Sequence, residues 1–300
     1  MPQNYRFKPV RIAFALCLFA AVLLPAWGHE APVNFAISAS VNWQRGELSA
    51  ETSFNLAQAG LRLPAGRLMG EDLLQRAWPR LFRPHLLSLR VDSSTTVRDL
   101  VERGELSLQD LDKISRQARK TPPSFSTDMA RMIGRYTVPI EEISTLLVNH
   151  RRPADPITPL IPVPTAEYTG IIIIADRELP VRGRHATALL QPSLFPRIWD
   201  TNMDLIYERT MLDPARTTMV RYAAPESIFR PTPSGLEGEL AALVGPRPLR
   251  IFAREVFGVY PTDPVIDRDD AMRILSSANN RRLLREGRVL LVLDAGKLGN

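Results

Sequence analysis

Apolar and polar residues alternate in two neighbouring stretches near the start of the chain. The first, NFAISASVNW, covers residues 34–43, and the second, LSAETSFNL, covers residues 48–56. Alternation with a period of two is typical of a strand that is buried on one face. The polar sequence QRGE separates the two stretches, so the pattern predicts a β-hairpin. Its inward face carries Phe35, Ile37, Ala39 and Val41.

Apolar residues then recur at helical spacing in residues 67–89. The positions are Leu68, Leu73, Leu74, Ala77, Leu81 and Leu86. Pro79 and Pro84 lie inside this pattern, and we expect them to limit how continuous the helix is, because proline has no N–H for the helical hydrogen bond. Ser107 begins a capping-box-like sequence that predicts a second helix, which should end near Lys120.

Residues 126–148 fit two patterns, because Ser126 could cap a short helix whereas RYTVPI at 135–140 could form a strand. A proline-rich segment follows at 151–166, and its prolines are Pro153, Pro156, Pro159, Pro162 and Pro164. Prolines at this density exclude a helix or a central strand and favour an extended, polyproline-like backbone. We interpret the segment as a semi-rigid linker between two parts, or as an edge segment that lies on one of them.

The C-terminal part contains more predicted strands than helices. The expected elements are a buried strand at 170–175, a hairpin of 195–200 with 205–210, a strand at 249–257, a helix capped by Asp267 that reaches about Leu284, and a buried strand at 287–296. This order is not a regular βαβα alternation, so we expect an α+β fold with a mixed or antiparallel sheet and helices packed on one face. The expected parts are a leader at 1–28, an N-terminal α+β domain at 29–150, the linker at 151–166 and a C-terminal α+β domain at 167–300.

The leader has the three parts of a secretory signal peptide. Positive residues come first, an apolar run at 12–24 follows, and Ala26-Trp27-Gly28 places small residues where a signal peptidase cleaves, after Gly28. A retained membrane anchor is the alternative, but the run is shorter than the roughly 20 residues that span a bilayer. Cys17 raises the further alternative of a lipoprotein, which the bulky Leu16 before it disfavours. We therefore expect export, and a periplasmic or outer-membrane-associated location.

Export changes how charge and cysteine content are interpreted. Three of the 38 Lys and Arg residues leave with the signal peptide, so 35 remain against 32 Asp and Glu. The single cysteine, Cys17, leaves as well, which excludes a disulfide and a thiol nucleophile in the mature chain. No basic block with interleaved aromatic residues is present, so nucleic acid is not an expected partner.

Common catalytic motifs are missing from the sequence. It contains no Gly-rich nucleotide loop, no H-E-x-x-H, no G-x-S-x-G and no C-x-x-C. The histidines outside the leader are His29, His85, His150 and His185, and none has a second histidine three or four residues away to form a metal-binding face. An N-terminal His29 could chelate copper, but we expect a plain chain end. We expect no metal, no cofactor and no catalytic residues.

Two carboxylate pairs deserve to be weighed as sites. Asp176 and Glu178 follow the apolar run at 171–174, and residues two apart on a strand point the same way, so they could act as an acid/base pair. A solvated loop at the end of a structural strand is the interpretation that we favour. The sequence DTNMD, Asp200 to Asp204, begins like a calcium loop, but Leu205 stands where glycine is required and Met211 where glutamate is required. A hairpin turn accounts for Asp200 and Asp204 equally well.

The order of motifs in residues 167–295 resembles a family of exported bacterial envelope proteins. That family contains LPP-type small lipoproteins and the flagellar assembly proteins FlgP and FlgT, the latter through its N-terminal domain. The matching positions are Thr169, Gly170, Asp176, Leu179, Pro196, Ile198, Asp200, Tyr207, Gly258, Ile266, Asp270, Ala271, Val292 and Asp294. Glu178 stands where the family has a small residue. The resemblance implies a non-catalytic role in envelope structures, including rings around the flagellar motor, and it implies no cofactor.

The sequence therefore predicts an exported, non-enzymatic protein that acts through protein–protein contacts in the envelope, in flagellar motor or outer-membrane-associated assembly. Its partners would be other envelope or flagellar basal-body proteins, a second copy of itself, or a membrane surface that it binds peripherally. Exposed sheet edges would mediate assembly. Two alternatives stay open: a ligand-binding module with a cleft between the two halves, and an envelope hydrolase that uses Asp176 and Glu178.

Overall fold

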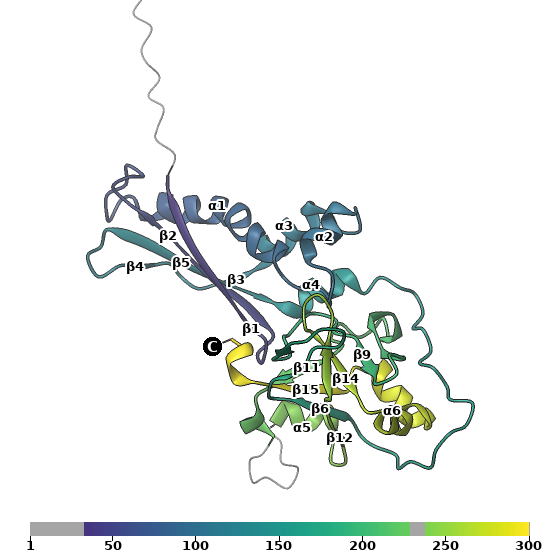
Figure 1. The fold of residues 1–300 in the computed structure, drawn as a ribbon. Coiled ribbons are helices and arrows are strands. Elements are labelled where there is room, and N and C mark those ends of the chain that lie inside the picture. Colours follow the sequence, from purple (N-terminus) through teal and green to yellow (C-terminus); the bar gives the residue numbers. More distant parts are fainter. Residues whose placement is uncertain (1–32, 229–237, 300) are drawn as a thin grey trace, which may run out of the picture. The chain divides into compact units, whose positions relative to one another are not determined.

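The N-terminal half is an antiparallel sheet with helices on one face. The computed structural model describes residues 33–228 and 238–299 (Figure 1). The strands are β1 (Phe35–Asn42), β2 (Glu47–Asn55), β3 (Arg119–Lys120), β4 (Ser124–Phe125) and β5 (Arg131–Pro139), and they pair in the order β1–β2–β5–β3, with β4 also on β5. The predicted hairpin is confirmed, because Phe35 pairs with Phe54 and Asn42 with Glu47. Of the two patterns at 126–148, strand β5 and the following helix α4 (Ile140–Leu147) are formed.

Helix α1 (Arg67–Leu87) continues through both of its prolines, although we expected them to limit its continuity. Its buried residues recur every four positions and pack on β1, β2 and β5; they are Gly70, Leu74, Trp78, Phe82 and Leu86. A proline inside a helix costs about 3 kcal/mol, and burial of a large apolar side chain contributes about 1.5–3 kcal/mol. The buried row, which runs on either side of Pro79 and Pro84, therefore outweighs the lost hydrogen bonds.

Two further helices complete the N-terminal half, and both begin with the expected chemistry of a cap. They are α2 (Val97–Glu102) and α3 (Leu108–Gln117). The hydroxyl of Ser107 accepts a hydrogen bond from the Asp110 N–H, as the sequence predicts. Thr96 and Asp99 form a complete capping box at the start of α2. The two caps fix where the chain turns after α1.

The C-terminal half contains two four-stranded sheets. One is parallel throughout, in the order β11–β15–β6–β12, and is built from β6 (Ile171–Ala175), β11 (Arg221–Ala223), β12 (Leu249–Phe252) and β15 (Val289–Leu293). The other is mixed, in the order β10–β9–β14–β13, and is built from β9 (Ile198–Asp200), β10 (Leu205–Tyr207), β13 (Glu255–Phe257) and β14 (Asp263–Ile266). Strands β7 (Leu179–Pro180) and β8 (Thr187–Ala188) form a small hairpin. The whole is an α+β fold, as predicted.

The parallel sheet is covered on both faces, which explains its unbroken apolar sequences. Helix α5 (Gly238–Val244) packs on the face that carries Ile172, Ile174 and Leu290. The opposite face joins the main core. Parallel strands that are buried on both sides read as continuous apolar runs, so the four isoleucines at 171–174 are a central strand.

Two stretches that were predicted as single elements are each divided in two. Residues 249–257 form β12 in the parallel sheet and β13 in the mixed sheet, because the chain leaves one sheet at Ala253 and enters the other. Residues 268–285 form α6 (Arg268–Leu275) and α7 (Ala278–Arg285), with Ser277 capping α7. Asp267 precedes α6, but its carboxylate pairs with Arg254 rather than capping the helix.

The proline-rich segment is attached to the C-terminal half near both of its ends. The Ala154 N–H donates to the Thr210 carbonyl oxygen at 2.8 Å, and the Thr165 hydroxyl donates to the Arg273 carbonyl oxygen at 3.2 Å. Between these points Leu160 is fully exposed. Figure 1 shows the segment as a long loop without helix or strand that arcs around the outside of that half.

Gly170 explains why the chain enters β6 through Thr-Gly. The Thr169 hydroxyl donates to the Val244 carbonyl oxygen at 2.7 Å, which brings the end of α5 against the backbone of Gly170. A Cβ atom at position 170 would lie 2.4 Å from the Val244 Cα and 2.6 Å from its carbonyl oxygen. Only glycine fits this approach of two backbones.

We expect Gly170→Ala to lower the free energy of unfolding by about 1–3 kcal/mol, because it overpacks a well-filled site. Denaturant unfolding followed by circular dichroism measures the change. Adding Val244→Ala should not restore stability, because the closest atom belongs to the backbone. An unchanged denaturation midpoint in Gly170→Ala would contradict this account.

Candidate functional site

Asp176 and Glu178 lie in different surroundings at the end of β6. Asp176 follows β6 and is partly exposed, whereas Glu178 is exposed. The Glu178 carboxylate accepts a hydrogen bond from the Thr187 hydroxyl at 2.9 Å, across the β7–β8 hairpin. Neither carboxylate lines the cavity at Trp43 and Tyr222 or the groove at Trp78 and Arg80.

The DTNMD turn holds an arginine where a calcium loop would hold a cation. Asp200 is fully buried, and one of its carboxylate oxygens accepts from the N–H groups of Asn202 and Asp204. Its other oxygen accepts from the Arg268 guanidinium at 2.6 Å, and Arg268 also pairs with Asp204. The carboxylates are therefore compensated by a side chain from α6. Among the described residues, no group of three or more His, Cys, Asp or Glu side chains is placed to hold a metal.

One of the contacts between the two halves is made by the loop between α1 and α2, residues 88–96, which we call the docking loop. Its backbone is paired with the C-terminal half: the Leu194 N–H donates to the Arg90 carbonyl oxygen at 3.0 Å, and the Phe195 N–H donates to the Val91 carbonyl oxygen at 2.7 Å. The Tyr260 N–H donates to the Ser93 carbonyl oxygen at 2.9 Å. Three backbone hydrogen bonds therefore hold the loop against two segments of the C-terminal half, residues 194–195 and Tyr260.

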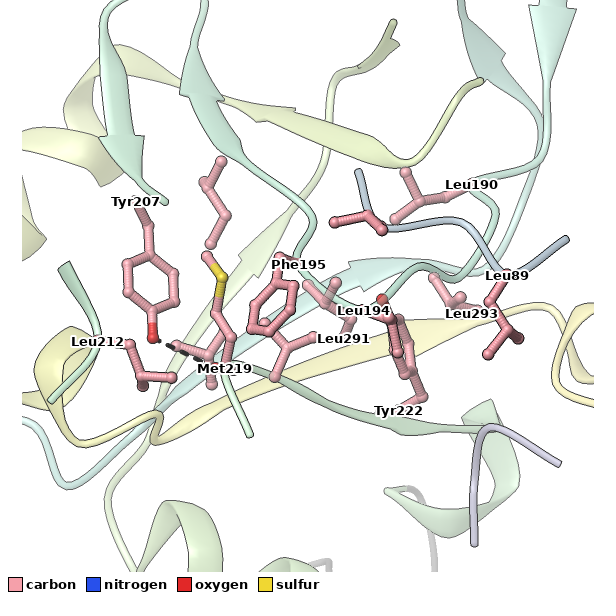
Figure 2. Close-up of a cluster of buried hydrophobic side chains, with 14 of the residues drawn as sticks. Leu89, Leu190, Leu194, Phe195, Tyr207, Leu212, Met219, Tyr222, Leu291 and Leu293 are labelled. Atoms are coloured by element: carbon pink, nitrogen blue, oxygen red, sulfur yellow. Dashed lines mark hydrogen bonds between the residues drawn. The ribbon is translucent and has the colours of Figure 1, made fainter. Parts of the chain in front are cut away.

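Apolar packing continues across the same junction. Figure 2 shows Leu89 of the docking loop next to Leu293 and near Tyr222, and Leu190 and Leu194 belong to the same buried cluster. The Tyr222 hydroxyl donates to the Ser193 carbonyl oxygen at 2.7 Å and accepts from the Ser193 N–H at 3.0 Å, so it is satisfied although it is buried. Burial raises the pKa of both Tyr222 and Tyr207, and both phenols stay protonated at neutral pH.

A buried carboxylate, Asp263, lies at the tip of the docking loop. It is fully buried and accepts four hydrogen bonds: from the Ser93 hydroxyl at 2.7 Å, the Arg197 N–H at 3.0 Å, the Thr262 hydroxyl at 3.1 Å and the Trp199 indole N–H at 3.2 Å. Burial raises the pKa of Asp263, and these donors oppose the shift. Because one donor comes from the N-terminal half, the carboxylate is fully satisfied only when the halves are joined.

The junction also contains a small, partly open cavity of about 180 Å³. Residues of both halves line it, among them Trp43 and Glu47 from the first hairpin and Tyr222 from β11. Arg119 and Glu47 at its rim pair with each other at 2.8 Å. The volume is below the roughly 300–1,000 Å³ that is typical of ligand sites.

The histidines are dispersed rather than gathered at one site. His150 has its Nε2 atom 2.6 Å from the Leu212 carbonyl oxygen and packs at the end of the N-terminal half. His85 lies on α1 and His185 in the exposed β7–β8 loop. His29 and Cys17 lie outside the described residues. His85 is next to the docking loop in the chain, because its carbonyl oxygen accepts a hydrogen bond from the Ser88 hydroxyl at 2.8 Å.

Sequence reasoning missed the residues that join the halves. Ser93 and Asp263 are 170 positions apart, and neither belongs to a motif. The Thr96–Asp99 capping box is the one local signal near the docking loop, because it fixes the end of that loop. The arginine that neutralises Asp200 could not be found from the calcium-like pattern, since it lies 68 residues away.

Gly258→Ala tests the docking loop. A Cβ atom at position 258 would lie 2.3 Å from the Ser93 Cβ, whereas one at Gly104 would meet nothing within 4 Å, and both glycines have positive φ. Gly104→Ala should therefore cost only the backbone penalty of about 1–2 kcal/mol. Gly258→Ala should lower the free energy of unfolding by about 1–3 kcal/mol more than Gly104→Ala does, as is usual when a well-packed interior is overfilled. If thermal unfolding shows that the two variants lose equal amounts of stability, the loop is not packed against Gly258 as described.

Asp263→Asn tests the buried carboxylate. In the folded protein its pKa is raised above the ordinary 3.8, so the folded state holds the proton more tightly than the unfolded state. Its contribution to stability is therefore complete below that value and is lost as pH rises through the raised pKa. Denaturant titrations of both proteins measure the free energy of unfolding at each pH. The value for the wild type minus the value for the variant should fall over this pH range. A difference that rises with pH would mean that the four donors outweigh burial.

Two family models match the chain. The model of the Treponema pallidum Tp0624 N-terminal domain matches residues 34–146, and the model of the Treponema pallidum Tp0624 second domain matches residues 170–295. No curated protein matches the chain. Neither matching description names the FlgP and FlgT family, so that resemblance stays a prediction. The docking loop lies inside the first matched range and Asp263 inside the second. Over these two ranges the chain is similar to the N-terminal and second domains of Treponema pallidum Tp0624.

Proposed function

We propose that the protein is a non-enzymatic, exported envelope component that binds another protein by adding a strand to its first sheet. The observation that carries this proposal is the open edge of β1. Among the described residues β1 pairs with β2 alone, and it is eight residues long. Long unpaired edges are ready templates for strand addition, and proteins that do not use them usually shorten, bend or charge them.

Contacts of β1 with residues 298 and 299 show which backbone groups of β1 point away from β2. The Trp43 N–H donates to the Leu298 carbonyl oxygen at 2.8 Å. A Cβ atom at Gly299 would lie 2.0 Å from the Val41 carbonyl oxygen, so this oxygen also faces away from β2. In an antiparallel pair alternate residues point their backbone groups to the same side. The N–H and carbonyl groups of Ile37 and Ala39 are therefore directed to the open edge.

The side chains of the same residues favour a partner as well. Ile37 and Ala39 face the helices but are only partly buried, because β1 is the outermost strand. The other face of β1 carries Ser38 and Ser40, which are exposed. An added strand with the same alternation would cover the apolar row and leave the polar face in water.

The location is inferred from the sequence. The leader at 1–28 has the form of a signal peptide, and it lies outside the described residues. No helix in the described ranges is both long and apolar enough to cross a bilayer. We place the protein in the periplasm or at the outer membrane, with other envelope or flagellar basal-body proteins or a second copy as the strand donor.

Site-specific photocrosslinking in cells tests the proposal. A crosslinking residue at Ser38, on the open edge, should give a discrete adduct. The same residue at Arg135 should not, because β5 lies two strands, or roughly 10 Å, further in. Both side chains are exposed on the same face of the sheet.

Proline variants show whether the adduct depends on backbone pairing. Ala39→Pro removes an N–H that faces the open edge, so it should abolish the Ser38 adduct while the circular dichroism spectrum is kept. Ser40→Pro is the matched control, since it removes an N–H that faces β2 and should lower the unfolding temperature. If a folded Ala39→Pro variant still gives the adduct, strand addition at β1 is wrong.

A further inference from the structure

A groove of about 650 Å³ lies on the helix-covered side of the N-terminal half, away from the β1 edge contacts just described. Its walls are α1 and α3, and β3 with Tyr136 of β5 closes one end. The volume falls within the roughly 300–1,000 Å³ that is usual for small-ligand sites.

Five cationic side chains line this groove. Arg76, Arg80 and Arg83 come from α1, where positions four and seven residues apart share one face. Arg116 comes from α3 and Lys120 from β3. Charges of one sign around a single concave surface concentrate the potential there.

Only two of the five cations are neutralised within the groove. Arg83 pairs with Asp112 at 2.7 Å, and Arg76 pairs with Asp72 at 2.6 Å. These two carboxylates are the acidic residues that line the groove. Arg80, Arg116 and Lys120 have no carboxylate of the described residues within 4.0 Å; Lys120 donates to the Gln75 side-chain oxygen at 3.2 Å. The groove thus keeps a local excess of three positive charges.

Two stacked aromatic rings line the groove, and one of them adds a further donor. The rings of Trp78 and Tyr136 stack 3.9 Å apart with an interplanar angle of 8°, and the Trp78 indole N–H donates to the Ser115 carbonyl oxygen at 2.6 Å. Burial raises the pKa of Tyr136, so its hydroxyl stays protonated. That hydroxyl has no hydrogen-bond partner among the described residues and can donate to a ligand.

We propose that this groove binds a phosphate monoester. Two guanidinium forks and one ammonium group offer only donors, one phenol can add another, and a guanidinium fork matches the oxygens of a phosphate group. A phosphate monoester carries close to two negative charges and three free oxygens at neutral pH. A carboxylate supplies one charge and two oxygens, which is a poorer match to three uncompensated cations. The monoester belongs either to a soluble phosphorylated molecule or to a lipid headgroup.

Binding measurements on the purified protein distinguish the two sources. Glycerol phosphate in calorimetry probes a soluble ligand. Co-sedimentation with phosphatidylcholine vesicles that contain phosphatidic acid probes a monoester at a membrane, and vesicles with phosphatidylglycerol carry a diester instead. We expect binding to glycerol phosphate, to phosphatidic acid vesicles or to both, weakened by salt.

Charge-matched variants show whether the groove is the site. The double change Arg80→Gln and Arg116→Gln should weaken binding at least about tenfold, since each charge-assisted bond is strong. Glutamine suits helices, so folding should be preserved, which the unfolding temperature checks. Arg98→Gln with Arg250→Gln removes the same charge at exposed positions outside the groove and should leave binding unchanged. No binding to either monoester, equal binding to phosphatidylglycerol vesicles, or equal losses in both double variants would overturn the proposal.

Discussion

The buried carboxylate of Asp263 is the interaction on which the arrangement of the two halves depends. A desolvated charge is costly unless donors replace the lost water, and the four donors of Asp263 come from three segments that are far apart in the sequence. One of them, Ser93, belongs to the N-terminal half. The docking loop must therefore be in place for Asp263 to keep all four donors, and the apolar contacts of Leu89 are made in the same position (Figure 2).

The same physical rule governs the turn that resembles a calcium loop. Asp200 is completely buried, and its two oxygens are satisfied by backbone N–H groups and by Arg268. Arginine suits this role because it is always charged and its guanidinium can serve two carboxylates at once. In this turn the positive charge that balances Asp200 and Asp204 is therefore an arginine side chain from α6.

The two halves bury their sheets in different ways, and this difference leads to the proposed roles. The parallel sheet of the C-terminal half has α5 on one face and the main core on the other, so it leaves no broad sheet face for a partner. The antiparallel sheet of the N-terminal half is covered on one side and ends in the open edge of β1. The groove between α1 and α3 lies on the covered side. Both proposed binding surfaces therefore belong to the N-terminal half, and the docking loop connects that half to the second sheet system.

Local patterns in the sequence determined the elements that depend on neighbouring residues. The first hairpin, the helix cap at Ser107 and the buried strand at 171–175 follow from alternation, capping chemistry and an apolar run, each of which acts within about ten residues. Tertiary packing decided what local rules leave open. Helix α1 continues through two prolines because burial of its apolar row contributes more than the lost hydrogen bonds cost. Residues 249–257 divide because the first part of this stretch pairs in the parallel sheet and the second part in the mixed sheet. The contact of Ser93 with Asp263 and of Arg268 with Asp200 joins positions that no local pattern relates, since only the folded chain brings a buried charge to its donors.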